Sequence, residues 1–323
     1  MTARLLGLVT LIVAVVAGGA GYVFLQQPEG RRVLVLNSYH QGYPWSDEIT
    51  QELRRALESR GVTLQVHYMG MMYVKTPETA AQAAGSAKSA VEAFAPDLLV
   101  TIDDPAIEHV IVPHYRGGEL PVVFAGLGSN AEKHGLPAGN VTGMVEKGSL
   151  FALLDVLRQF SGGATVGALA GDTPETRRTL NRYQRQLGVP FQAVELVAGF
   201  REWKQAYRQL QDEVDVLYVH DNVGIPDWNA AEAVRFANEN AVVPSGSINT
   251  WMAPVVLFVF GRDPGEHGSW AAETAMSILE GQSPDSIQII ESSRTPTLVN
   301  SRMARSLLVD VPVQLIEGAT DVQ

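Results

Sequence analysis

The sequence predicts an α/β protein made of two similar lobes, each with a parallel sheet flanked by helices. The first observation is that short runs rich in β-branched residues alternate with longer amphipathic segments from residue 31 onward, a pattern typical of parallel sheets. The second is that this pattern runs twice along the chain, and the third is that no Gly/Ser linker or charge run separates the two copies. Lobes of comparable size that are joined directly by strands are expected to face each other across a cleft.

The composition excludes several classes of protein. The chain has 323 residues, of which 46% are hydrophobic and 18% charged, as in ordinary globular proteins. Its 24 Lys and Arg against 35 Asp and Glu give a net charge of -11, and such a surface repels nucleic acid and anionic lipid. The chain has no cysteine, which removes disulfides, thiolate zinc sites and cysteine nucleophiles.

Residues 1–25 are expected to be a leader that precedes the fold. Arg4 is followed by an uncharged run over residues 5–25 with small residues over 17–21, as in an export signal. The run is also just long enough to span a bilayer. The leader is therefore either a cleaved signal peptide, with the exported form beginning near Gly21, or an N-terminal membrane anchor. The intact mass of the native protein distinguishes the two outcomes, and in both cases the remainder is expected in the periplasm.

The first lobe is predicted over residues 31–146, with five strands and three helices. Thr76 and Asp104 each stand directly before a proline, the arrangement of an N-cap followed by proline at the first helical position. Ser46 is interpreted as a third helix cap. Strands are expected over residues 32–38, 62–69, 97–102, 121–126 and 140–146, and helices over 46–59, over 76–94 and from 104 onward.

The second lobe repeats the pattern over residues 147–251, where Thr173 is the expected cap of a helix. We expect residues of about 252–283 to return to the first lobe, about 284–312 to complete the second, and 313–323 to form a tail. The expected strands are 164–170, 190–197, 215–219 and 255–261, and the expected helices are 149–160, 174–187, 200–213, 226–240 and 264–279.

Ligands of parallel sheets bind outside the carboxyl ends of the strands, so the candidate site residues are those that follow strands. The loop after the first strand holds Tyr39, Tyr43 and Trp45, more aromatic residues than a turn needs. Tyr39 and Trp45 are expected to stack on a planar or apolar ligand, and at least one of the three is expected to pack the edge of the lobe instead. Asp103 follows the third strand and is either a hydrogen-bond acceptor for a ligand ammonium or hydroxyl, or a solvated loop acid.

Four further strand-end residues complete the candidate site. Gly126 lies in Gly-Leu-Gly-Ser-Asn-Ala, where glycine lets the backbone approach a ligand. The same letters match a dinucleotide-binding motif, but a glycine and a proline shortly downstream break the long helix that such a motif needs. Glu146 falls at the hinge and either binds ligand or fixes the hinge. Asp221 is the preferred contact from the second lobe, and Asn249 is expected to face the same cleft.

An enzyme is not supported by the motifs. The sequence has no Gly-x-Ser-x-Gly elbow, no His-Glu-x-x-His and no Gly-Lys-Ser/Thr loop. His109 and His114, with a proline between them, do not have the spacing of a metal pair. We therefore expect no catalytic residues, no cofactor and no metal. The strand-end loops that hold Tyr39, Trp45, Asp103 and Asp221 contain no arginine, which argues against a ligand recognised chiefly through phosphate or several carboxylates.

The stretch VLVLNSYHQGYPWSDEI resembles the opening of the ABC transporter substrate-binding family that includes tryptophan- and tyrosine-binding members, and of related periplasmic sensor modules. TIDDPAIEHVI, PVVFAGLGSN, NVTGMVE, VLYVHDN and GSWAAETAMSILEGQSP extend the similarity over nearly all of residues 32–310, whereas the charged stretch 260–267 departs from the family. The resemblance implies the type I periplasmic-binding-protein fold, in which two lobes joined by three crossovers close on a small ligand. It places the ligand contacts at Tyr39, Trp45, Asp103, Gly126, Glu146, Asp221 and Asn249.

The sequence therefore predicts an exported, monomeric solute-binding protein of an ABC-type importer. Its expected partners are a small amino-acid-like or aromatic ligand and an ABC permease. The alternative is a periplasmic sensing module that reports to a membrane sensor or histidine kinase. Nucleic acid is excluded as a partner by charge.

Overall fold

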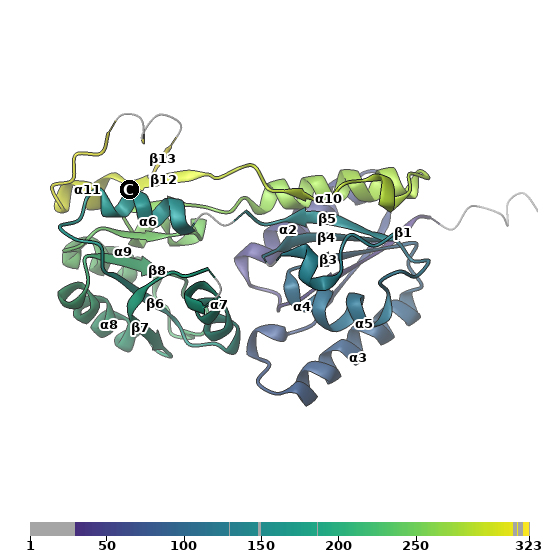
Figure 1. The fold of residues 1–323 in the computed structure, drawn as a ribbon, viewed down its shortest axis with the longest axis horizontal. Helices are drawn as coiled ribbons and strands as arrows, with labels where there is room; N and C mark the ends of the chain where they lie inside the picture. The colour runs from purple at the N-terminus through teal and green to yellow at the C-terminus, as the bar shows by residue number, and fades with distance from the viewer. Residues whose placement is uncertain are drawn as a thin grey trace, which may run out of the picture.

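The computed structural model describes residues 30–128, 130–147, 150–185, 187–312, 315 and 319–322. The leader predicted over residues 1–25 lies outside these ranges. Within them, no helix is both long and apolar enough to cross a membrane. Figure 1 shows two lobes side by side, each with a sheet flanked by helices, which confirms the predicted fold class.

The N-terminal lobe is built on a six-stranded sheet with the order β11-β5-β4-β3-β1-β2. All of its strand pairs are parallel; Val33, for example, lies opposite Leu64 on one side and Leu98 on the other. Its elements are β1 (Arg32–Asn37), α2 (Pro44–Glu58), β2 (Thr63–Tyr68), η1 (Met71–Tyr73), α3 (Pro77–Phe94), β3 (Leu98–Ile102), α4 (Asp104–Ala106), η2 (Ile107–Ile111), α5 (Val112–His114), β4 (Val122–Leu127), η3 (Ala131–His134), β5 (Val141–Val145), α10 (Pro264–Leu279), η5 (Pro284–Ser286) and β11 (Ile290–Glu291).

The C-terminal lobe has a seven-stranded sheet with the order β13-β12-β10-β9-β8-β6-β7. Its pairs are parallel except for β10 with β12. Its elements are α6 (Leu150–Arg158), β6 (Val166–Gly171), α7 (Pro174–Arg185), β7 (Phe191–Val197), α8 (Phe200–Glu213), β8 (Val216–Val219), α9 (Ala230–Asn240), β9 (Ser245–Ser247), η4 (Thr250–Val255), β10 (Phe258–Phe260), β12 (Thr297–Asn300), α11 (Ser301–Ser306) and β13 (Thr320–Val322).

The helix starts follow the predicted caps at Thr76 and Thr173 but not at Ser46. Thr76 accepts a hydrogen bond from the backbone N–H of Thr79 in a reciprocal capping box, and Thr173 accepts one from Thr176. The helix α2 begins two residues before Ser46, at Pro44, so Ser46 is buried inside the helix and the cap prediction there is wrong. Proline at the first position fixes a helical φ, which explains the earlier start.

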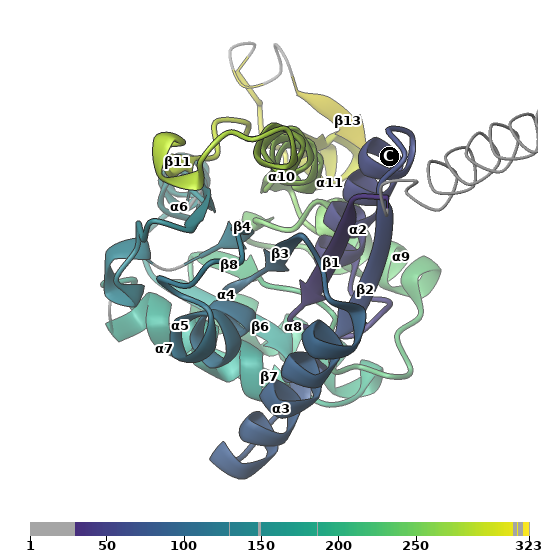
Figure 2. The ribbon, with the colours of Figure 1, turned by 90° about the vertical axis from the view of Figure 1, so that its right-hand side faces the viewer.

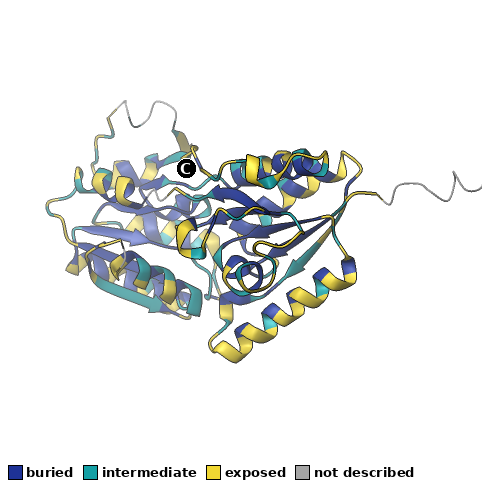
Figure 3. Ribbon diagram, turned by 45° about the vertical axis from the view of Figure 1, so that its right-hand side comes forward, coloured by how far each residue is buried: buried dark blue, intermediate teal, exposed yellow. Residues whose placement is uncertain are grey.

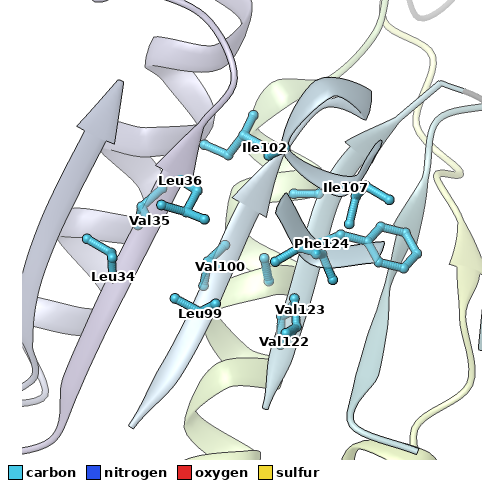
Figure 4. Close-up of a cluster of buried hydrophobic side chains, with 14 of the residues drawn as sticks. Leu34, Val35, Leu36, Leu99, Val100, Ile102, Ile107, Val122, Val123 and Phe124 are labelled. Carbon is cyan, nitrogen blue, oxygen red and sulfur yellow. The ribbon is translucent and has the colours of Figure 1, made fainter. Parts of the chain in front are cut away.

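The hydrophobic core of the N-terminal lobe lies on both faces of its sheet. The strands β1, β3 and β4 are buried almost throughout, and Figure 4 shows their apolar side chains projecting from neighbouring strands. Figure 2 shows α10 and α2 on one side of this sheet and α3 with α5 on the other. The outer helix faces are exposed while the strands are buried (Figure 3), as expected for a parallel sheet covered on both faces.

The chain crosses between the lobes at places that differ from the expected boundaries. Residues 252–260 belong to the C-terminal lobe, because η4 packs in its core and β10 pairs with β9 and β12. The return to the first lobe therefore comes at about residue 261, immediately before α10. β11 still belongs to the first sheet, since it pairs with β5, and part of the expected tail, β13, pairs with β12. An apolar run reveals that a strand is buried but not which of two adjacent sheets it joins.

Candidate ligand-binding cleft

A cavity of about 800 Å³ lies between the two lobes. Its walls come from the carboxyl ends of strands in both sheets and from α7, the arrangement in which open α/β sheets bind ligands. The first lobe and its hinge contribute Tyr39, Tyr43, Asp103, Gly126 and Glu146 to the wall of the cavity. The second lobe and its hinge contribute Arg182, Tyr183, His220, Asp221 and Arg262.

The carboxyl group of Asp103 is buried in this wall, with the residue 6% exposed. Its Oδ1 accepts a hydrogen bond of 2.8 Å from Trp45 Nε1, whereas its Oδ2 is buried with no hydrogen-bond partner among the described residues. The backbone has φ 68°, an unusual value for a residue other than glycine and one that clusters at functional sites. Burial raises the pKa of Asp103 well above its ordinary value, although Trp45 and Arg262 partly oppose the shift. Asp103 is thus buried at a cost in free energy, and one of its carboxyl oxygens lacks a hydrogen-bond partner among the described residues.

The ring of Trp45 lies behind the wall and does not line the cavity. The guanidinium of Arg262 lies over the ring, with Cζ 4.2 Å from a ring centroid, and the imidazole of His267 meets it edge-on at 5.4 Å. Both contacts, together with the hydrogen bond to Asp103, fix the indole within the lobe. Stacking of Trp45 on a ligand therefore stays a prediction, whereas its contacts in the structure are with Asp103, Arg262 and His267. Of the aromatic residues in this loop, Tyr39 and Tyr43 line the cavity instead.

Tyr39 and Tyr43 pack edge-to-face, with ring centroids 5.2 Å apart. Burial raises the pKa of both hydroxyls above the ordinary value of a tyrosine, so both remain protonated and can donate hydrogen bonds. Their rings offer an apolar and aromatic surface beside Asp103. This part of the cavity suits an aromatic or apolar group next to a hydrogen-bond donor.

Arg262 is a cleft residue that the sequence interpretation missed. It follows β10 by two residues, and its Nη1 lies 3.1 Å from Glu146 Oε2 with both side chains 12% exposed. Its Nη2 donates to Asn249 Oδ1. The sequence prediction covered the loops that hold Tyr39, Trp45, Asp103 and Asp221, and these contain no arginine. It did not cover the residues that follow β10, where Arg262 reaches the hinge.

The same contacts assign roles to Glu146 and Asn249. Glu146 lines the cavity at the first crossing and pairs with Arg262 at the second, so it joins two hinge segments. Asn249 is 1% exposed and does not line the cavity; its Nδ2 donates 2.6 Å to the carbonyl of His220. Burial is the largest single effect on Arg262 and lowers its pKa, but Glu146, Tyr43 and Tyr183 together outweigh burial, and the pKa lies above its ordinary value. Arg262 is therefore charged and engaged by protein partners.

The second lobe contributes Asp221, which is 3% exposed. Its Oδ1 accepts a hydrogen bond of 3.0 Å from the N–H of Val223, and its Oδ2 lies 3.5 Å from His220 Nε2. Burial raises the pKa of Asp221 and lowers that of His220, so the histidine is neutral at pH 7 and does not balance the carboxylate. His220 is further fixed by Tyr218, whose hydroxyl lies 2.8 Å from Nδ1.

Gly126 lines the cavity with φ 73°. A Cβ at this position would lie 3.2 Å from the indole of Trp45 and 3.3 Å from Asp103 Oδ1. Its N–H donates to His267 Nδ1 at 3.2 Å. Glycine is thus required here by both the positive φ and the close approach of Trp45 and Asp103.

Contacts between η1 and α7 bridge the lobes at the mouth of the cavity. Arg178 donates to the carbonyl of Val74 at 3.3 Å, and the Arg182 guanidinium lies 3.8 Å from Asp104. Asp104 also accepts a hydrogen bond of 2.8 Å from the N–H of Gly128. It lies in the first turn of α4, where it connects two loops, and the prediction that it is the N-cap is wrong. The structure is therefore closed at this side by protein contacts.

We expect the double substitution Arg178→Ala and Arg182→Ala to open the ligand-free protein. The bridging contacts are partly exposed, so their loss should shift the closing equilibrium by about 1 kcal/mol, roughly fivefold. The radius of gyration from small-angle X-ray scattering should rise. Arg177→Ala is the matched control, because Arg177 lies on the same helix but pairs with Asp172 of its own lobe; an equal rise in this control would contradict the bridging role.

Within the described part of the chain, one cluster of acidic and histidine side chains has the spacing of metal ligands. Ligand atoms of Asp104, Glu108 and His134 lie within 4.8 Å of one another. The carboxylate of Asp104 already faces Gly128 N–H and Arg182, so protein contacts account for its position.

No protein-family model matches the chain. The chain is 26% identical over 223 residues to a tyrosine-binding protein of Clostridioides difficile, a match that spans 65% of this chain and 63% of that relative. Among solved structures, it is similar to an ABC domain in complex with L-Trp from Streptococcus pneumonia (TM-score 0.64, 18% identity, 91% of this chain and 100% of the other). It is also similar to the open, ligand-free form of a substrate-binding protein with adhesive properties from Clostridium difficile (TM-score 0.59, 19% identity, 91% and 99%). The chain therefore has the two-lobed fold of the type I periplasmic binding proteins.

Proposed function

We propose that the protein is an exported solute-binding protein that captures a small organic ligand by closure of its two lobes. The observation that carries this proposal is a cavity between the lobes whose wall includes a buried acidic residue from each lobe, Asp103 and Asp221. A ligand that contacts both groups holds the lobes together, which is hinge closure around a ligand. Glu146 and Arg262 fix the hinge from the two crossing segments.

The ligand class follows from the wall and from the relatives. Tyr39 and Tyr43 provide aromatic surface beside Asp103, which favours a planar or apolar group with an attached amino or hydroxyl group. The relatives include a tyrosine-binding protein and a structure in complex with L-Trp. We propose an amino-acid-like or aromatic ligand, bound by Tyr39, Tyr43, Asp103, Gly126 and Asp221, with Trp45, Glu146 and Asn249 as supporting residues.

Delivery to the permease of an ABC importer is the proposed use of the bound ligand. The similarity to a substrate-binding protein and to an ABC domain supports it. The protein would act in the periplasm as a monomer, tethered to the inner membrane if residues 5–25 remain, and would perform no chemistry on the ligand.

A thermal-shift screen with amino acids, aromatic amines and small organic acids tests the proposal. A ligand that binds only the folded protein stabilises it by about 2.7 kcal/mol at a hundredfold excess over Kd. We expect at least one aromatic ligand to raise Tm and to lower the radius of gyration. Silence of every aromatic and amino-acid ligand would overturn the proposed ligand class, and a product found by mass spectrometry after incubation would overturn the non-enzymatic assignment.

A further inference from the structure

The helix α7 presents a basic face to the cavity. Of its residues that line the wall, Arg178, Arg182 and Arg185 are basic and Glu175 is acidic. The chain as a whole has a net charge of -11, so this face concentrates positive charge in a protein that is otherwise acidic. Such a face favours a ligand that carries negative charge.

Two of the arginines in the cavity wall are engaged by protein groups. Arg262 lies 3.1 Å from Glu146 and also donates to Asn249. Arg178 donates hydrogen bonds of 3.0 and 2.8 Å to Glu175 and further bonds to backbone carbonyls of the first lobe. A ligand anion bound by either guanidinium would have to replace these contacts.

The guanidinium of Arg182 lacks a short contact of this kind. Its ion pair with Asp104 spans 3.8 Å from Nη1 to Oδ1, which is longer than a hydrogen bond. The other oxygen of Asp104 accepts the N–H of Gly128. Among the described residues, no carboxylate oxygen lies within hydrogen-bond distance of Arg182, and its side chain is 28% exposed in the wall of the cavity. Arg182 therefore has N–H donors for a ligand.

Arg182 is positioned by contacts with both lobes. A Cβ on Gly128 of the first lobe would lie 3.4 Å from both terminal nitrogens of Arg182, so glycine makes room there for the guanidinium. Its Cζ lies 5.8 Å from the ring centroid of Tyr183 in the second lobe. Burial lowers the pKa of His220, and the positive charge of Arg182 adds to that effect, so this charge acts on a second residue of the cavity wall. A planar guanidinium held in this way can donate two parallel hydrogen bonds to one carboxylate.

We propose that Arg182 binds a carboxylate of the ligand, and that the ligand is an aromatic carboxylic acid such as an aromatic amino acid. This inference rests on the proposed function and names the residue that selects the anionic group of the ligand. The ring of the ligand packs against Tyr39 and Tyr43. Burial raises the pKa of Tyr39, and the charge of Asp104 adds to that effect, so Asp104 lies near Tyr39 as well as beside Arg182. A carboxylate on Arg182 therefore leaves the ring of the same ligand within reach of Tyr39.

Calorimetric titration of the full chain with two matched pairs tests the inference: tryptophan against tryptophanamide, and tyrosine against tyrosinamide. Within each pair the ring and the amino group are the same, and a neutral amide replaces the carboxylate. A pH of about 6 keeps the α-amino group charged in all four compounds. We expect the acid to bind at least ~10-fold more tightly, because the amide cannot accept two charge-assisted hydrogen bonds from Arg182. Amides that bind as tightly as the acids, or more tightly, would overturn the inference and leave the proposed function standing. Binding of none of the four compounds would overturn both.

Substitution of Arg182 locates the selectivity. Arg182→Gln should weaken binding of the amino acids by roughly 10- to 100-fold and affect the amides much less, so that the preference for the acid is lost. Loss of the contact with Asp104 alone would weaken acid and amide equally; equal weakening would make Arg182 a structural residue and overturn the inference. Arg177→Gln is the matched control, because Arg177 lies on α7 but pairs with Asp172 of its own lobe, and it should leave the preference unchanged. Circular dichroism checks the fold of each variant.

Discussion

Arg262→Met is expected to lower the free energy of unfolding by about 3–5 kcal/mol, because it leaves the Glu146 carboxylate buried without its cation. Methionine keeps much of the packing over the Trp45 ring, so the loss reports mainly on charge and hydrogen bonds. Asn249 Oδ1 loses its donor in the same variant, which adds to the cost. Urea unfolding followed by circular dichroism measures the effect.

A double substitution tests whether the lost stability comes from the broken ion pair or from general disruption of the hinge. Arg262→Met combined with Glu146→Gln removes the stranded charge and should recover much of the lost stability. Arg294→Met is the control for an exposed pair, since Arg294 faces Asp263 with 69% of its side chain exposed, and should cost less than about 1 kcal/mol. A double variant no more stable than Arg262→Met alone would contradict the assignment of the cost to Glu146.

The two-sheet architecture was accessible from the sequence because buried parallel strands are continuous apolar runs bounded by clear breaks. The strand β3 and the strand β4 both show this pattern, and both are buried throughout. The strand β10 shows it equally well, yet its partners are β9 and β12 rather than strands of the first sheet. Local pattern reports burial, whereas sheet membership is decided by contacts between residues far apart in the chain.

The same distinction applies to the residues that line the cavity. Asp103 and Asp221 line the cavity as predicted, because a polar residue directly after a buried strand lies at the carboxyl edge of the sheet. Trp45 is not among the residues that line the cavity, because α2 begins at Pro44 and Trp45 is buried in its first turn. Arg262 stands in a charged stretch next to Asp263, Glu266 and His267, where sequence alone does not show which charge is buried. A charged residue two positions after an apolar run was the available signal.

Asp103→Asn is expected to make the ligand-free protein more stable while it weakens ligand binding. Asparagine can accept the hydrogen bond from Trp45 Nε1 and tolerates a positive φ, and it has no charge to desolvate. At neutral pH we expect the free energy of unfolding to rise by about 1–3 kcal/mol. Stability sacrificed for a preorganised binding group is a common feature of functional sites.

The stability difference between wild type and Asp103→Asn is expected to depend on pH, which a change in side-chain packing alone would not produce. The pKa of Asp103 is higher in the folded protein than in the unfolded chain, so the folded state holds the proton at pH values where the unfolded state has lost it. Folding stability from this group is therefore lost as pH rises from about 4, the ordinary value of an aspartate, through the raised folded value. The stability of wild type relative to Asp103→Asn should fall over that interval, and the two should converge at lower pH, as measured by urea unfolding at a series of pH values. A variant that is less stable than wild type at neutral pH would mean that the carboxylate stabilises the fold, and Asp103 would then be a structural acid rather than one held ready for a ligand cation.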